Sequence, residues 1–97
     1  MKVVALVVDL ADRVTIGEGV RFVRSADALV EAAGEPSCEL VLVDLTLPGA
    51  LDVLPKLPGR VIAFGPHVDA EVLATAAERG AEAMPRSRFF REQPWRG

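Results

Sequence analysis

The chain has 97 residues and a net charge of −3, and 51% of its residues are hydrophobic against 26% charged. This length suits one compact domain, and the apolar content excludes a disordered chain. The apolar run at residues 3–8 is too short to span a bilayer or to form the core of a signal peptide. The single cysteine, Cys38, excludes an intramolecular disulfide and a zinc cluster. We therefore expect one cytoplasmic domain over residues 1–97, with no membrane partner and, given its negative charge, no nucleic-acid partner.

Three continuous apolar runs, at residues 3–8, 40–43 and 61–64, predict strands that are buried on both faces. Such runs are typical of parallel sheets, because helices cover both sides of the strands. Residues 20–23 and 81–84 predict two weaker strands. The sequence therefore indicates a sheet of five strands.

Helix signals alternate with these strands. Ser25 as N-cap and Gly34 as C-terminal stop bound one predicted helix, and Asp69 and Gly80 bound another. Residues 50–57 predict about one helical turn before a proline stops it. Alternating strands and helices predict an α/β domain with a parallel sheet.

The order and spacing of these segments carry a family resemblance. Residues 41–49, with the sequence VLVDLTLPG, resemble the third strand and following loop of two-component (CheY-like) receiver domains. Residues 6–9 resemble the first strand of that family, residues 61–69 its fourth strand and loop, and residues 80–82 the start of its fifth strand. The resemblance covers nearly the whole chain and implies a flavodoxin-like, five-stranded parallel sheet in the order 2-1-3-4-5.

In that fold the carboxyl ends of the first and third strands lie together at the topological switch point. We therefore expect Asp9 and Asp44 to lie close together, in an oxygen-rich corner that suits Mg²⁺. The resemblance implies that Asp44 aligns with the phosphoacceptor and Asp9 with a metal-binding acid. It also implies that the carbonyl of Thr46 is a metal ligand, which gives a possible Mg²⁺ site of Asp9, Asp44 and Thr46.

Three positions depart from the family pattern. Leu10 stands where the family has a second acid, Gly65 where it has threonine or serine, and Ser87 where it has lysine. Arg86 or Arg88 could supply a cation, but an arginine differs from that lysine in reach and direction. We therefore expect a pseudo-receiver that is not phosphorylated efficiently and is not an enzyme.

The family's first and last helices have little room in this chain. Only ten residues, 10–19, lie where the family has its first helix, and a parallel crossover needs about a dozen. The β-branched run 14–16 favours an extended connector. Pro94 limits the last helix to one or two turns. We therefore expect the first helix to be missing and the last to be truncated.

Both shortened elements cover the same face of the sheet in the receiver fold, so that face is expected to lie bare. Several hundred Å² of exposed apolar surface would cost on the order of 10 kcal/mol at ~25 cal/mol per Å². We therefore expect a second copy of the chain, or another signalling protein, to cover it. The predicted interface residues are Val3, Ala5, Val7, Phe89, Phe90 and Trp95.

These observations favour a stand-alone receiver-like signalling or protein-interaction module that forms a homodimer or a higher oligomer. Two alternatives stay open at this point. A working receiver would accept a phosphoryl group on Asp44 with Mg²⁺ bound. A small flavodoxin-like binding protein or enzyme would share the fold, although no glycine-rich phosphate loop follows the first strand.

Overall fold

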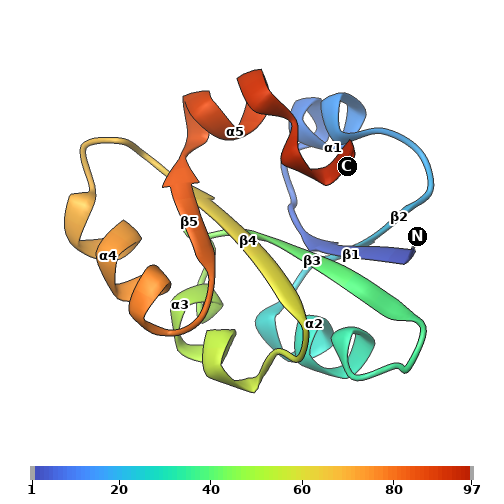
Figure 1. Ribbon diagram of the computed structural model, residues 1–97. Helices are drawn as coiled ribbons and strands as arrows, with labels where there is room; N and C mark the ends of the chain where they lie inside the picture. Colours follow the sequence, from blue (N-terminus) through green and yellow to red (C-terminus); the bar gives the residue numbers. More distant parts are fainter. Residues whose placement is uncertain (1, 97) are drawn as a thin grey trace.

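The structure, a computed structural model, describes residues 2–96 and contains one five-stranded sheet (Figure 1). The strands are β1 (Lys2–Leu6), β2 (Val20–Val23), β3 (Cys38–Asp44), β4 (Arg60–Gly65) and β5 (Glu82–Pro85). They lie in the order β2-β1-β3-β4-β5, and each neighbouring pair is parallel. The predicted flavodoxin-like sheet, with strand order 2-1-3-4-5, is confirmed.

Helices connect the strands and follow the last one. They are α1 (Leu10–Ile16), α2 (Ala26–Ala33), α3 (Ala50–Val53), α4 (Ala70–Glu78) and α5 (Arg86–Glu92), with 3-10 turns η1 (Leu54–Lys56) and η2 (Pro94–Arg96). Ser25 caps α2 as predicted, since its Oγ accepts a hydrogen bond from the Ala28 backbone N–H at 3.1 Å. Within residues 2–96, no helix has both the length and the apolar character that crossing a membrane requires.

Helix α1 corrects the prediction that the first helix is missing. Strand β1 ends at Leu6 and not at residue 8, so the crossover to β2 spans residues 7–19. Thirteen residues are enough for a right-handed parallel connection that contains a short helix. The prediction was wrong because it assigned residues 7 and 8 of the connection to the strand and began the connection only after Asp9.

Local interactions explain why these residues form a helix in spite of their β-branched side chains. Asp9 is the N-cap, and its Oδ1 accepts a hydrogen bond from the Asp12 backbone N–H at 3.0 Å. The β-branched residues lower helix propensity by only a few tenths of a kcal/mol each. Burial of the Ile16 side chain offsets that cost, and Gly17, with φ of 102°, ends the helix.

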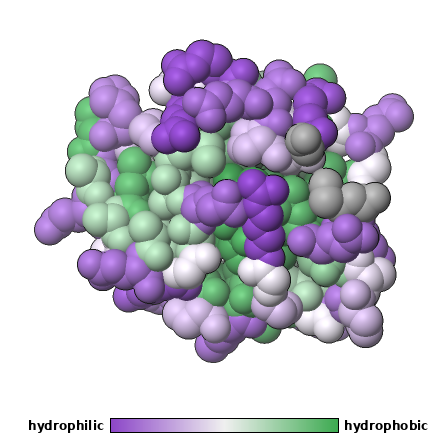
Figure 2. Space-filling view, in the orientation of Figure 1, coloured by the Kyte–Doolittle hydropathy of each residue, from purple (hydrophilic) through white to green (hydrophobic). Residues whose placement is uncertain are grey.

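The chain covers both faces of its own sheet. One face packs against α2, α3 and α4, and the other against α1, α5 and η2. The second face is the one that the sequence predicted to be bare. Figure 2 shows hydrophilic residues over α5 at the top of the molecule, which agrees with the arginine-rich sequence of this helix. Helix α5 is therefore amphipathic, with its aromatic side chains toward the sheet.

Aromatic side chains let a short last helix close this face. Phe89 stacks on Phe64 of β4 with 4.3 Å between ring centroids, and the Trp95 ring lies 4.7 Å from Phe89. The Trp95 Nε1–H donates to the backbone carbonyl of Ile16 at 3.1 Å, which fastens η2 to α1. Each aromatic residue buries about 150–250 Å², so two helical turns suffice where an aliphatic helix would have to be longer.

The predicted interface is therefore corrected. Five of its residues are buried within the chain, and the sixth, Phe90, is half-buried. The five buried residues are Val3, Ala5, Val7, Phe89 and Trp95. Residues this buried cannot form the surface that contacts a second molecule, and the expectation of a bare sheet face is wrong. The predicted truncation of the last helix is confirmed, since α5 has seven residues and ends before Pro94.

Replacing Phe89 with alanine should lower the free energy of unfolding by about 3–5 kcal/mol, because a fully buried ring leaves a cavity beneath α5. Urea unfolding followed by circular dichroism measures this loss. Phe90→Ala is the matched control on the same helix and should cost less than half as much, since Phe90 is half-buried. Equal losses for the two variants would contradict the assignment of Phe89 to the core.

Candidate functional site

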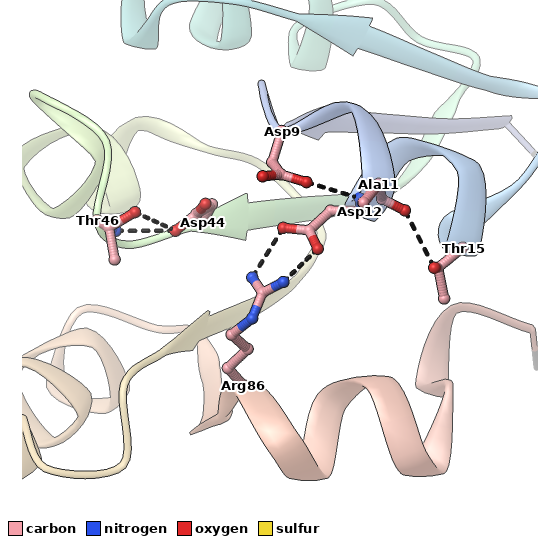
Figure 3. Close-up of polar contacts among 7 residues, drawn as sticks. All are labelled: Asp9, Ala11, Asp12, Thr15, Asp44, Thr46 and Arg86. Atoms are coloured by element: carbon pink, nitrogen blue, oxygen red, sulfur yellow. Dashed lines mark hydrogen bonds and ion pairs between the residues drawn. The ribbon is translucent and has the colours of Figure 1, made fainter.

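Polar side chains from three elements meet at the carboxyl edge of the sheet (Figure 3). Asp44 is the last residue of β3, and Asp9 follows β1 and caps α1. Arg86 is the first residue of α5, directly after β5. The structure thus places Asp44 at the end of β3 and Asp9 in the connection after the neighbouring strand β1, at the topological switch point of the sheet.

Asp44 is a buried carboxylate, and Thr46 orients it. Its Oδ1 accepts two hydrogen bonds, from the Thr46 backbone N–H at 3.0 Å and from the Thr46 hydroxyl at 2.7 Å. These bonds form a local Asx turn that fixes the start of the loop after β3. The N–H and hydroxyl of Thr46 donate to Asp44, and its carbonyl, the predicted metal ligand, takes no part in these bonds.

Asp9 is exposed, and one of its oxygens has a structural task. Its Oδ1 caps α1 by accepting the Asp12 backbone N–H. A capping interaction of this kind stabilises a helix by about 1 kcal/mol. The presence of an acid at this position is therefore explained by the helix, without a bound ligand.

An ion pair between Asp12 and Arg86 is the main feature of the site. The Arg86 guanidinium donates to both carboxylate oxygens of Asp12, with Nη1 at 2.7 Å from Oδ2 and Nη2 on Oδ1. The Asp12 side chain is only 7% exposed, and the Arg86 side chain is 48% exposed. A bidentate pair with one buried partner holds both side chains in one geometry. It also joins the start of α1 to the start of α5.

The site fixes the charge and the position of Arg86. Hydrogen bonding to Asp12 raises the pKa of Arg86 above its usual value, and the negative charges of Asp12, Asp44 and Asp9 add to the rise, while partial burial opposes it. The guanidinium carbon also lies 4.8 Å from the ring centroid of Phe90, within the range of a cation–π contact. Arg86 is therefore a permanent positive charge among three carboxylates.

Sequence reasoning found only part of this arrangement. It named Arg86 or Arg88 as a possible cation, and the structure selects Arg86, because Arg88 pairs with Glu92 on the surface at 3.0 Å. Asp12 was missed as a site residue. Its only sequence signal is its position three residues after Asp9, in the first turn of a helix that was not predicted.

The Arg86 guanidinium disfavours a divalent cation at this edge. Mg²⁺ requires six oxygen ligands in octahedral geometry, usually including one or two carboxylates that are free to bind. In the part of the chain that the structure describes, no group of three or more acidic, histidine or cysteine side chains is arranged to hold a metal ion. Both oxygens of Asp12 bind Arg86, and the guanidinium adds a positive charge that repels a second cation.

Two grooves lie elsewhere on the molecule. One lies between α3 and α4 and is lined by Leu51, Glu71, Val72, Ala74, Thr75 and Glu78, and the other lies between α1 and β2. Neither groove includes Asp9, Asp44 or Arg86.

The sequence matches no protein-family model and no curated protein. The flavodoxin-like α/β fold is therefore established by strand order and direction alone. The placement of Asp9 and Asp44 bears on the more specific resemblance to receiver domains, which strand order alone does not distinguish from other flavodoxin-like proteins.

Replacing Arg86 with alanine should lower the free energy of unfolding by about 1–3 kcal/mol, because it leaves the buried Asp12 carboxylate without its partner. Urea unfolding measures the loss. Arg88→Ala is the matched control on the same helix. Its exposed pair with Glu92 should contribute less than about 0.5 kcal/mol.

The wild-type protein and the Arg86→Ala variant together test whether Arg86 takes the place of a metal ion. Millimolar Mg²⁺ should leave the thermal midpoint of the wild-type protein unchanged. It should raise the midpoint of Arg86→Ala, since the three carboxylates then lack their cation. A rise in the wild-type midpoint as large as that in the variant would contradict the inference that Arg86 takes the place of a metal ion.

Proposed function

We propose that the protein is a receiver-like protein-interaction module in signal transduction that works without phosphorylation of Asp44. The fold and the position of Asp44 at the end of β3 support the comparison with receivers. The bidentate pair of Arg86 with Asp12 carries the rest of the proposal, because it occupies the acidic corner with a group of the chain itself.

Phosphoryl transfer depends on positive charges and donors that neutralise the transferred group. The receiver resemblance implies a metal ion, a hydroxyl after the fourth strand and a lysine after the fifth. Here the hydroxyl position is Gly65, and the available cation is already bound to Asp12. Each group that would stabilise a phosphoryl group on Asp44 is thus absent from its family position or engaged elsewhere.

The geometry around Gly65 supports the same conclusion. A Cβ built on Gly65 would lie 3.6 Å from the Leu45 Cβ and 3.7 Å from the Leu73 Cδ2, which are ordinary contact distances. Contact at the Cβ position therefore does not impose glycine here. The missing hydroxyl is a departure from the receiver pattern that packing of a Cβ does not require.

The second candidate function is a working receiver with Asp44 as the phosphoacceptor. One observation favours it. Both hydrogen bonds of the Asp44 carboxylate fall on Oδ1, so Oδ2 accepts none of the hydrogen bonds found in residues 2–96. This oxygen could attack an acyl phosphate, in which case the acyl group leaves as a carboxylate and an aspartyl phosphate forms.

Incubation with acetyl phosphate and Mg²⁺, followed by intact-mass spectrometry, separates the two functions. We expect no gain of a phosphoryl group, because Arg86 is held by Asp12 and its charge disfavours binding of the added Mg²⁺ beside Asp44. An active receiver domain treated in parallel shows that the reagent works. A gain in the wild-type protein that disappears in Asp44→Asn would overturn the proposal and favour the working receiver.

A further inference from the structure

Strand β2 forms an open edge of the sheet. It pairs with β1 on one side and with no strand of residues 2–96 on the other. The outer N–H and C=O groups of an edge strand are able to pair with a strand of another molecule. The edge is therefore a candidate contact surface.

An apolar groove runs beside this edge, on the α1 face of the sheet. It has a volume of about 430 Å³ and is lined by Arg13, Val14, Gly17, Glu18, Val20 and Phe22. Helix α1 has only seven residues, so it leaves Val20 and Phe22 half-buried, and Val14 is 81% exposed. Apolar side chains in this position favour contact with another apolar surface over contact with water.

The charges at the two ends of β2 indicate what that surface is. Glu18 precedes the strand and Arg24 follows it, and both are exposed. Neither takes part in an ion pair within residues 2–96, whereas Arg21 is bound to Glu35 at 2.9 Å. When a second copy of β2 lies antiparallel to the first, the end of each strand that carries Glu18 lies beside the end of the other strand that carries Arg24. The edge is thus complementary to itself in charge as well as in apolar character.

The opposite edge of the sheet lacks these properties. Strand β5 ends in Pro85, which has no N–H to donate. Its Glu82 is held by Arg60 of β4 through bonds of 2.7 and 3.0 Å. The β2 edge is therefore better suited to pairing than the β5 edge, and two copies that pair β2 with β2 about a two-fold axis close as a dimer.

We propose that two copies of the chain associate through their β2 strands, antiparallel about a two-fold axis, to form a continuous ten-stranded sheet. Phe22 faces its counterpart at the axis on the α1 side, since the alternative register places Arg21 directly opposite Arg21 of the other copy. In the proposed register Glu18 lies diagonal to the second copy's Arg24, within reach of such long side chains. This interface does not depend on the chemistry of Asp44.

A charge swap tests the interface without disturbing the core. Sedimentation and light scattering should show a concentration-dependent species of twice the 10.4 kDa chain mass. Glu18→Arg alone and Arg24→Glu alone should each raise the dimer dissociation constant about tenfold, and the double swap should restore it to within about threefold. Glu71→Arg, an equal charge change on α4, is the matched control and should leave the constant unchanged.

Cross-linking tests the register. In a Cys38→Ser background, Phe22→Cys should form a disulfide-linked dimer on mild oxidation, because facing Cβ atoms lie about 4.5–5.5 Å apart and need to approach by only about 1 Å to reach disulfide geometry. Arg21→Cys in the same background should remain uncross-linked. A monomer at all concentrations, a dimer that ignores the charge swap, or a cross-link at position 21 instead of 22 would overturn the proposal. A monomer that binds an extended peptide along β2 would instead identify a different partner.

Discussion

The structure depends on covering a sheet that is apolar on both faces with a chain of 97 residues. Helices α2, α3 and α4 cover one face in the usual way. On the other face the stack of Phe89 on Phe64, with Trp95 beside it, replaces most of a longer helix. The aromatic side chains thus bury the area that a longer helix would bury, and their contacts place α1 and α5. The positions of α1 and α5 in turn bring together the polar residues of the carboxyl edge.

At the carboxyl edge of the sheet, one side chain has two roles. Arg86 neutralises the buried Asp12 and, by bridging α1 and α5, fixes the two elements that close the aromatic face. A mobile metal ion supplies positive charge reversibly, whereas a guanidinium of the chain supplies it permanently. The proposed function, an interaction module that works without phosphorylation, requires only such a permanent arrangement at the carboxyl edge.

The sequence predicted the sheet well because buried parallel strands leave a strong signal, as in the runs at 40–43 and 61–64. It failed at α1, because hydrophobicity alone could not show that Val7 belongs to the connection and not to the strand. That error implied a bare face and a wrong interface. Within the site, Asp44 could be placed from its position after a strand. Asp12 and Arg86 could not be paired, since they are 74 residues apart and only the fold brings them together.

The bond from Trp95 to the carbonyl of Ile16 joins parts of the chain that are 79 residues apart. A contact of such sequence separation carries a larger loop-closure cost than a local one, because more of the chain must lose conformational freedom to form it. During synthesis, the first half of the sheet emerges from the ribosome well before residues 86–96 exist to cover it. Until residues 86–96 are added, one face of the strands lacks the aromatic side chains that cover it in the folded chain.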